Sequence, residues 1–314
     1  MDGHGGRLRV TFHDDPAAFL SVAGPVLGAD PVTGTVVATI AQRVAHELAG
    51  GVDSWEAVGA PFARWWATVH DVPGGTGPGE GPVVGVAMRT AGFERYPAFL
   101  LPMPDDAARV LAREVHDRGE ELRGLNGALP AVRVCAEETA RLLGGSVHLL
   151  VRTRLFEARH VDHPAAPDGS LSLAGPGDLE VCAAWFAAFH ADADRQAGRR
   201  PGEGGEHPPD RDDVARRIER GTVALWRDGQ GRPVHLTGWN PPAFGVARIG
   251  PVYTPAEHRG RGYAAAAVAA TTQRFLDDGV RVCLFTDQAN PVSNALYERL
   301  GYRPVTDMAQ LVVE

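Results

Sequence analysis

Residues 249–264 constrain the fold more than any other stretch of the sequence. A strand pattern ends near Thr254, a basic loop with glycines follows, and an alanine-rich helix begins near Gly262. Glycine lets a backbone approach a ligand closely, and a helix start offers unpaired N–H groups and the positive end of the helix dipole. The pattern predicts a phosphate or pyrophosphate site to which Arg259 and Arg261 add positive charge. Spacing alone leaves open a solvent-exposed turn with two arginines.

A second informative segment begins at Asn290-Pro291, where Asn suits the N-cap and Pro the first helical position, and it ends at Gly301. The spacing predicts that one stripe of this helix faces the core: Val292, Leu296 and Leu300. It places the remaining informative residues on another face: Asn290, Ser293, Asn294 and Tyr297. Spacing alone also allows Tyr297 to be an ordinary half-buried amphipathic residue.

These two segments, in this order, resemble the GNAT superfamily of acetyl-CoA-dependent N-acetyltransferases. The family signature Arg/Gln-x-x-Gly-x-Gly/Ala is matched by Arg259-Gly260-Arg261-Gly262-Tyr263-Ala264, and residues 290–302 match the second cofactor helix. The resemblance covers residues 170–314. It implies an α/β (α+β) fold in which a mixed, twisted sheet is flanked by helices. Its central strands splay apart, and the pantetheine arm of acetyl-CoA enters the gap.

The resemblance also implies roles for individual residues. Backbone groups would pair with the pantetheine amides at Val252, Tyr253 and Thr254. Backbone amides would hold the pyrophosphate at Arg259, Gly260, Arg261, Gly262, Tyr263 and Ala264. Asn290 and Ser293 would contact the cofactor arm. Tyr297 would be the general acid, because a phenol with a pKa of about 10 can protonate a departing thiolate as charge develops.

The general base is not evident from the sequence. Its candidates are Glu257, His258, Asp287 and a chain of water molecules. Asp287 follows the strand that precedes the Asn290 helix, which is a common position for site residues. Glu257 and His258 border the phosphate loop, where a structural role is expected. Asp287 and a water relay are the two favoured readings.

The first half of the chain echoes the second, since each ends in strand, helix, strand, helix, strand. This predicts a duplication, although α/β domains commonly alternate in this way. At the equivalent of the phosphate loop the first half has Asp105 and Asp106 and no glycines, and its helix over residues 130–143 has no tyrosine. We therefore expect a degenerate GNAT-like domain over 1–165 and a catalytic GNAT domain over 170–314.

Smaller elements are predicted as well. Residues 55–66 have helical spacing, and residues 73–82 have the composition of a flexible connector. The Gly- and Pro-rich segment from Arg195 to Asp210 is expected to be a mobile loop beside the acceptor, as the corresponding region is in the GNAT family.

Composition excludes several functions. The chain has no lysine among its 31 basic residues, which excludes Schiff-base enzymes and Walker-A ATPases. A net charge of −8 argues against a nucleic-acid partner and weakly favours a cationic acceptor. The pair His160 and His163 lacks a third metal ligand nearby in sequence, so no metal is expected.

Three scattered cysteines form no disulfide framework, and no leader or membrane-spanning run is visible, so a cytoplasmic protein without a membrane partner is expected. The predicted function is transfer of an acetyl group from acetyl-CoA, as co-substrate, to a primary amine of a small molecule or peptide. Transfer of a longer acyl group and CoA binding without turnover remain alternatives. The acceptor stays open among an aminoglycoside, a polyamine, an amino acid and a peptide N-terminus, and the oligomeric state stays open too.

Overall fold

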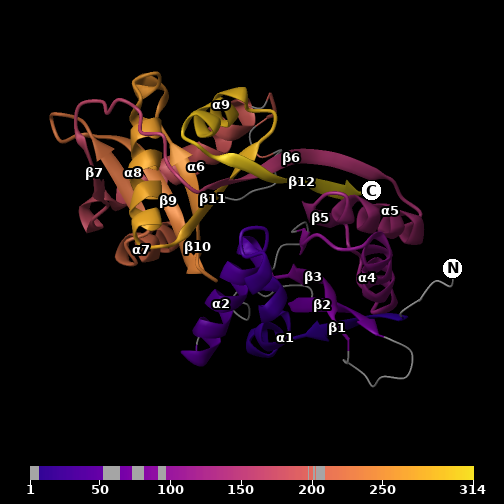
Figure 1. Cartoon of the computed structure of the whole chain (residues 1–314). Coiled ribbons are helices and arrows are strands. Elements are labelled where there is room, and N and C mark those ends of the chain that lie inside the picture. The colour runs from indigo at the N-terminus through magenta and orange to yellow at the C-terminus, as the bar shows by residue number, and fades with distance from the viewer. Residues whose placement is uncertain are drawn as a thin grey trace. The chain divides into compact units, whose positions relative to one another are not determined.

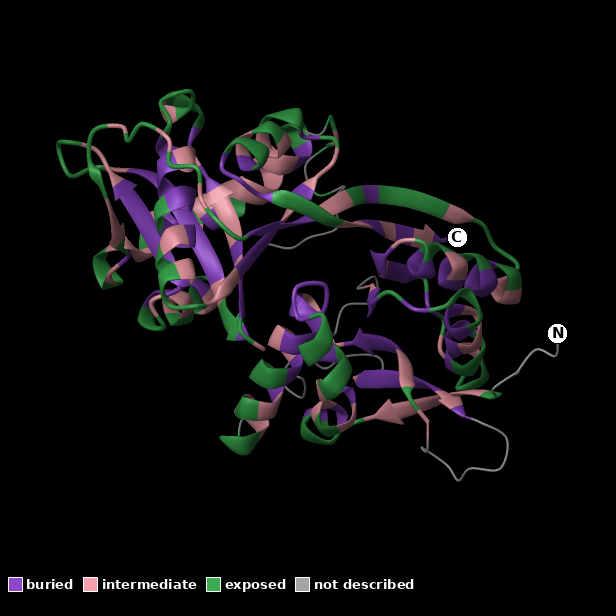
Figure 2. Ribbon diagram, in the orientation of Figure 1, coloured by how far each residue is buried: buried purple, intermediate pink, exposed green. Residues whose placement is uncertain are grey.

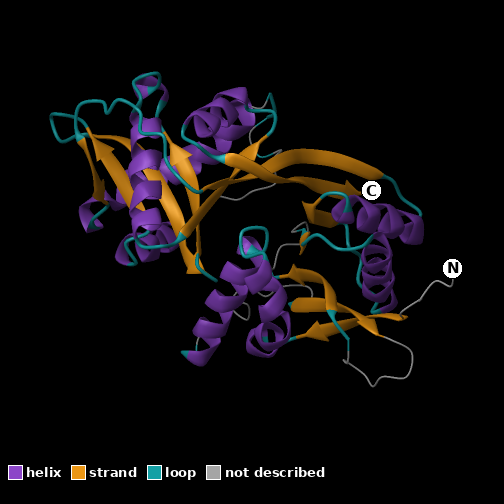
Figure 3. Cartoon of the chain, in the orientation of Figure 1, coloured by secondary structure: helices purple, strands orange, loops and turns teal. Residues whose placement is uncertain are grey.

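A computed structural model describes residues 7–51, 64–72, 81–90, 97–196, 198–200, 202 and 209–314. Contacts between residues divide the chain into two units. Unit 1 contains Met1–Arg152 and Thr306–Glu314, and unit 2 contains Thr153–Val305. Each unit is a mixed sheet flanked by helices (Figure 3).

The described elements run in the same order in both halves of the chain (Figure 1). In the first half they are β1 (Arg7–His13), α1 (Pro16–Ala29), α2 (Thr35–Ala49), β2 (Trp65–Val72), β3 (Val83–Arg89), β4 (Ala98–Leu100), α4 (Asp105–Asp117), β5 (Gly124–Ala128), α5 (Ala131–Leu143) and β6 (Val147–Ala158). In the second half they are β7 (Ser170–Leu173), α6 (Leu179–Gln196), α7 (Arg211–Glu219), β8 (Val223–Arg227), β9 (Pro233–Ala243), β10 (Val246–Tyr253), α8 (Tyr263–Asp277), β11 (Arg281–Asp287), α9 (Pro291–Arg299) and β12 (Arg303–Val313). Short 3-10 turns, η1 (Pro176–Asp178) and η2 (Ala256–His258), precede α6 and the loop into α8.

Each unit takes its last strand from the other half of the chain. The strand order is β1-β2-β3-β4-β5-β12 in unit 1 and β7-β8-β9-β10-β11-β6 in unit 2. Residues 308–312 of β12 pair antiparallel with β5, and residues 153–158 of β6 pair antiparallel with β11. In each unit one pair, β4/β5 or β10/β11, is parallel. The units therefore differ from the sequence halves 1–165 and 170–314, which remain a prediction about which segments repeat.

In unit 2 helices pack on both faces of the sheet. Neighbouring residues of β8 show this, because successive side chains of a strand point to opposite faces. Ala224 packs in one cluster with Val268 of α8, whereas Leu225 packs in another with Phe186 of α6 and Val214 of α7. Helix α9 adds to the cluster on the α8 side. Figure 2 shows the buried residues gathered along the strands between these helices.

In unit 1 the prediction of a helix over residues 55–66 is wrong at its end, because Trp65 and Trp66 begin β2. The other residues of that range lie outside those described, as do residues 73–80 of the predicted connector. Trp65 packs against the cluster of α4 and α5, and Trp66 stacks on Phe19 of α1 with ring centroids 6.2 Å apart. Both indoles are fully buried, on opposite faces, which requires the two-residue period of a strand.

Among the helices that the structure describes, none has the length and apolar character needed to cross a membrane.

Candidate active site

Strands β10 and β11 diverge in unit 2. They pair with each other over residues 246–249 and 281–284. Farther along, residues 252–253 of β10 pair with β9, and residues 285–287 of β11 pair with β6. Their facing edges are therefore free, and a cavity of about 480 Å³ lies there, lined by residues of both strands.

The divergence begins at an irregularity in β10. The register between β10 and β9 shifts between Ile249 and Val252. Pro251 lies in this bulge and has no N–H to donate to a neighbouring strand. The bulge thus marks the point where β10 leaves β11.

The cavity is lined by all of the residues predicted to bind the cofactor, together with Tyr297 and Asp287. They belong to the end of β10, the loop into α8, and the turn into α9. The residues that line it include Val252, Tyr253, Thr254, Arg259, Gly260, Arg261, Gly262, Tyr263, Ala264, Asp287, Asn290, Ser293 and Tyr297. Their shared cavity makes them candidates for one ligand, while the role of each stays a prediction.

The loop before α8 presents free backbone amides. Gly260 and Gly262 have φ values of 74° and 84°, a region that glycine adopts without strain. Gly262 is the N-cap of α8 and has no side chain to cap it. In the part of the chain that the structure describes, no group accepts a hydrogen bond from the amides of residues 260–265. Such a helix start binds anions through its N–H groups and its dipole.

The Arg259 side chain holds the end of β10 and the helix α6 together. Its Nε donates to the Thr254 carbonyl at 2.9 Å, and its Nη2 pairs with Asp192 Oδ2 at 2.5 Å. Asp192 also accepts from the Tyr253 hydroxyl at 3.1 Å and from Arg195. Burial of Asp192 works to raise its pKa, but the bonds from Arg195, Arg259 and Tyr253 outweigh burial and leave the pKa below its usual value. This carboxylate therefore stays ionised, and Arg195 and Arg259 balance its charge beside the anion site.

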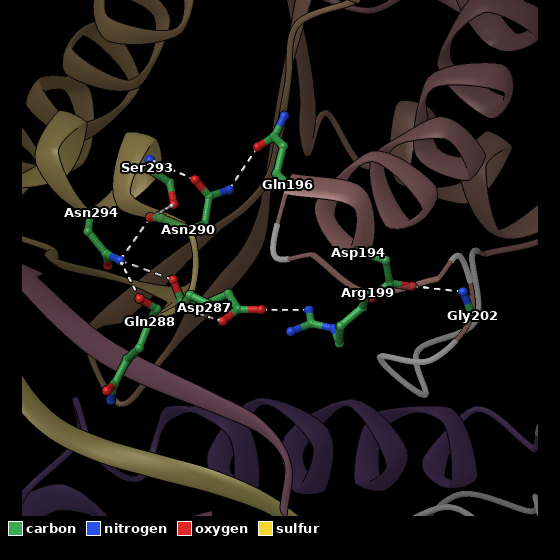
Figure 4. A network of polar contacts seen from close by, with 10 residues as sticks. Asp194, Gln196, Arg199, Gly202, Asp287, Gln288, Asn290, Ser293 and Asn294 are labelled. Carbon is green, nitrogen blue, oxygen red and sulfur yellow. Dashed lines mark hydrogen bonds and ion pairs between the residues drawn. The ribbon is translucent and has the colours of Figure 1, made fainter.

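The turn between β11 and α9 is fixed by side-chain amides (Figure 4). Asn290 caps α9 by accepting from the Ser293 amide at 3.2 Å, as predicted, and its own amide donates to Gln196 of α6 at 2.8 Å. The Asn294 amide donates to the carbonyl oxygens of Asp287 at 3.0 Å and Asn290 at 2.8 Å. These bonds fix where α9 begins and how it is oriented.

Asp287 is held by two donors. Its Oδ2 pairs with Arg199 Nη2 at 2.5 Å, and its Oδ1 accepts from the Ala289 amide at 2.8 Å. Arg199 also pairs through Nε with Asp194 Oδ1 at 3.1 Å, and Asp194 Oδ2 accepts from the Gly202 amide at 2.8 Å. Figure 4 shows Arg199 between the two carboxylates. We call Asp194, Arg199 and Asp287 the acidic triad.

The sequence analysis did not identify the contributions of α6 and the residues after it: Asp192, Asp194, Gln196 and Arg199. The sequence signal there is a mixed run of charges from Asp192 to Arg199, and such a run names no partner. Of the predicted loop from Arg195 to Asp210, Arg199 and Gly202 contact unit 2 through the acidic triad. Residues 197, 201 and 203–208 lie outside those described, and the mobility of the loop stays a prediction.

Tyr297 lies on the buried side of α9 and lines the cavity. Its side chain is 6% exposed, and burial raises the pKa of its phenol well above the usual value. Its ring meets that of Tyr302 edge-on, with centroids 5.8 Å apart. Among the described residues nothing hydrogen-bonds its hydroxyl, whereas the Tyr302 hydroxyl bonds Thr272 at 2.6 Å.

The predicted core stripe of α9 is wrong at its first position. Val292 is 73% exposed at the wall of the cavity, while Leu296 is partly buried and Leu300 is buried. The helix packs through Tyr297 and Leu300, so its buried side is rotated toward the tyrosine. A short helix that lines a cavity does not need apolar burial along its first turn.

The three side chains that are candidates for the general base differ in whether they line the cavity and in whether they have a hydrogen-bond partner. Asp287 lines the cavity but is ion-paired, and Glu257 is exposed and does not line it. His258 lines the cavity, and its Nδ1 is buried without a hydrogen-bond partner among the described residues.

Thiol and metal chemistry find no support in the described part of the chain. Cys135, Cys182 and Cys283 are buried, form no disulfide with a described residue, and do not line the cavity. Burial raises the pKa of both Cys135 and Cys182 to about 12, which keeps them protonated. No three His, Cys, Asp or Glu side chains of the described segments gather as metal ligands.

In unit 1 the equivalent strands stay close together. Leu100 of β4 is paired with Gly127 of β5, and a Cβ on Gly127 would lie 2.2 Å from the Leu100 carbonyl oxygen. Helix α4 follows Pro104, which has no N–H, and carries Asp105 and Asp106 in its first turn. Two carboxylates at a helix start occupy the position that an anion would take.

Comparison with known proteins supports the fold. Residues 230–310 match the family described as FR47-like protein. A GCN5-related N-acetyltransferase from Sphaerobacter thermophilus aligns over 97% of this chain and 94% of its own, with 16% identity and a TM-score of 0.59. A GNAT-family acetyltransferase from Colwellia psychrerythraea aligns over 98% of this chain and 100% of its own, with 12% identity and a TM-score of 0.53. A search of curated protein sequences found no match.

These findings confirm the resemblance to the GNAT superfamily and the predicted fold, two GNAT-like domains that each contain a mixed sheet flanked by helices. At identities this low, the likeness to solved structures establishes the fold and leaves the reaction to be argued from the site.

Proposed function

We propose that unit 2 is an N-acetyltransferase that transfers an acetyl group from acetyl-CoA to a primary amine. The observation that carries this proposal is the cavity between β10 and β11, with free amides of residues 260–265 along one wall and the unpartnered hydroxyl of Tyr297 on another. An anion-binding helix start and a buried proton donor in one cavity fit a ligand with a pyrophosphate at one end and a leaving thiolate at the other.

The chain's own groups fit acetyl-CoA. The amides of residues 260–264 would bind the pyrophosphate, with Arg261 nearby, whereas the predicted Arg259 amide already donates to the Ala256 carbonyl at 3.3 Å. The free edge of β10 at Val252, Tyr253 and Thr254 would pair with the pantetheine amides, as a strand would. Asn290 and Ser293 would contact the arm where α9 begins. Arg195 and Arg259 balance the negative charge of the ionised Asp192, which would otherwise repel the phosphates.

In the proposed reaction a C–N bond forms between the acceptor amine and the acetyl carbon, and the C–S bond of the thioester breaks. Tyr297 donates its proton to the departing sulfur and regains one from solvent. The raised pKa of Tyr297 keeps the phenol protonated until negative charge develops on that sulfur. The amine loses its proton to a base, for which Asp287 and a water relay are the two candidates.

An acceptor screen tests this proposal. Purified protein is incubated with acetyl-CoA and individual amines, and released CoA is measured with a thiol reagent. Release that depends on an amine, and falls in Tyr297→Phe, supports an enzyme. Binding of acetyl-CoA without release for any amine would favour the alternative of a CoA-binding module. Comparing acetyl-CoA with longer acyl-CoA thioesters decides the second alternative, transfer of a longer acyl group.

The reduced cytosol remains the proposed compartment, because the three cysteines are buried and form no disulfide with a described residue.

A further inference from the structure

We propose that Asp287 binds a second, non-reacting positive charge of the acceptor, and that Arg199 and Asp194 position its carboxylate for this task. The inference rests on the proposed function. It narrows the acceptor to amines that carry another cationic group, such as a diamine or a polyamine.

The charge balance of the acidic triad carries the argument. One guanidinium, Arg199, bridges two carboxylates that are both largely buried: the side chains are 18% exposed for Arg199, 7% for Asp194 and 15% for Asp287. The triad thus keeps one excess negative charge. Of its members, Asp287 is the one that lines the cavity. An excess negative charge that is largely shielded from water attracts a cation, so this wall of the cavity favours one.

The part of the cavity lining beside the phosphate loop has the reverse charge balance. There Asp192 is shared by two guanidiniums, Arg195 and Arg259, and among the described residues Arg261 donates to the Glu257 carbonyl at 3.1 Å. The cavity is therefore positive beside the phosphate loop and negative at the end of β11. A ligand pair with an anionic cofactor and a cationic acceptor matches this polarity.

Tyr297 is an independent sign that a ligand enters here. Its side chain is more than nine-tenths buried and its hydroxyl lacks a partner among the described residues, yet the residue lines the same cavity as Asp287. The hydroxyl is therefore free to donate to a ligand that enters the cavity.

The geometry assigns binding rather than proton removal to Asp287. Both of its oxygens already accept bonds, from Arg199 and from the Ala289 amide, so taking a proton from the amine would weaken one of these bonds. A carboxylate of this kind also stabilises a bound ammonium in its protonated form. That suits a group that anchors the acceptor, whereas the attacking nitrogen must be neutral.

The experiment compares 1,4-diaminobutane with n-butylamine, which has the same chain and one amine. CoA release is measured for the parent protein, for Asp287→Asn, and for Asp213→Asn as a control. Asn at 287 can still accept from the Ala289 amide and leaves Arg199 paired with Asp194. Asp213 belongs to an exposed ion pair with Arg216 on α7, away from the cavity lining.

We expect the parent and Asp213→Asn to prefer the diamine by about tenfold in kcat/KM, mostly through KM, and Asp287→Asn to lose this preference. Equal use of both amines by the parent, or an unchanged preference in Asp287→Asn, would overturn the inference. A loss of kcat for both amines in Asp287→Asn, at unchanged KM, would assign proton removal to Asp287 and also overturn it.

A binding measurement covers the case in which neither amine is acetylated. Calorimetric titration of 1,4-diaminobutane into the CoA-saturated protein should give a dissociation constant that Asp287→Asn weakens about tenfold, and equal affinities would refute the inference. Failure of the proposed function is recognised separately, since no amine would then cause release of CoA from acetyl-CoA, whether or not acetyl-CoA binds.

Discussion

The rings of Tyr297 and Tyr302 meet edge-on at 64° with centroids 5.8 Å apart, yet only the Tyr302 hydroxyl has a hydrogen-bond partner among the described residues. The two neighbouring phenols of this core cluster therefore differ in their hydrogen bonding. Tyr302 completes a bond with Thr272, whereas the Tyr297 hydroxyl belongs to the cavity. This pair provides a matched comparison within one protein.

Tyr297→Phe should lower kcat by roughly 10²–10⁴-fold, because it removes the proton donor and keeps the ring. Its stability and its affinity for acetyl-CoA should barely change. Tyr302→Phe should do the reverse: it should cost about 1–2 kcal/mol of unfolding free energy by leaving Thr272 unpaired, with little loss of rate. CoA release and urea unfolding measure the two effects. An undiminished kcat in a folded Tyr297→Phe protein would remove Tyr297 from the mechanism.

Gly262→Asp should abolish the rise in melting temperature that acetyl-CoA produces, because it places bulk and negative charge at the anion site. The control is Gly279→Asp, at the other end of α8. Gly279 has a φ of 72°, is exposed and has open space around its Cα, so the backbone strain is matched while the phosphate loop is untouched. Thermal melting with and without acetyl-CoA separates the variants. If acetyl-CoA raises the melting temperature of Gly262→Asp as much as that of Gly279→Asp, the anion site does not lie at Gly262.

Acetyl-CoA should bind once per chain, in unit 2. In unit 1 the Leu100–Gly127 pair holds β4 and β5 together, and Asp105 and Asp106 occupy the helix start. Calorimetry should therefore give a stoichiometry near one, and Gly262→Asp should remove all of the heat. A second binding event that survives this substitution would show that unit 1 also takes the ligand.

His235 should make the protein less stable as the pH falls below about 6.5. It is fully buried between Thr237 and Thr254, and desolvation lowers its pKa to about 3. Below the usual histidine pKa the unfolded chain binds a proton that the folded chain excludes, so acid favours unfolding. From about pH 7 to about pH 5 the loss should approach 2 kcal/mol.

Urea unfolding at both pH values, for the parent and for His235→Gln, measures the contribution of this histidine. The variant should have a lower free energy of unfolding than the parent at neutral pH. On acidification, however, its free energy of unfolding should fall much less than that of the parent. An equal loss in the variant would assign the pH dependence to other groups. The exposed His148 offers the control, since His148→Gln should leave the loss unchanged.

The two cofactor segments were predictable from sequence because their signals are local. The predicted helix start near Gly262 and the Asn290 cap agree with the observed bounds of α8 and α9. A glycine loop before a helix, and an Asn-Pro start, are properties of a few consecutive residues. Local signals of this kind do not depend on the tertiary contacts made by the rest of the chain.

The acidic triad and the orientation of α9 were not predictable. Arg199 and Asp287 are far apart in the sequence, and no local pattern records that they meet. The exposure of Val292 depends on the cavity beside it, which periodicity does not encode. The strand patterns of β6 and β12 likewise reveal extended chain, but not which sheet each strand joins.

Because β6 and β12 are exchanged between the two halves of the chain, each half needs a strand from the other to complete its sheet. A fragment limited to residues 170–314 would leave the 282–287 edge of β11 bare and lack the Thr153 carbonyl that accepts from Gln288 at 3.1 Å. The first half would likewise lack the strand that follows β5. Neither half of the gene encodes a complete sheet. Deleting, recombining or separately expressing one half therefore also removes a strand from the sheet of the other half. Selection that preserves the fold of the second half therefore also preserves the strand that the first half contributes to it.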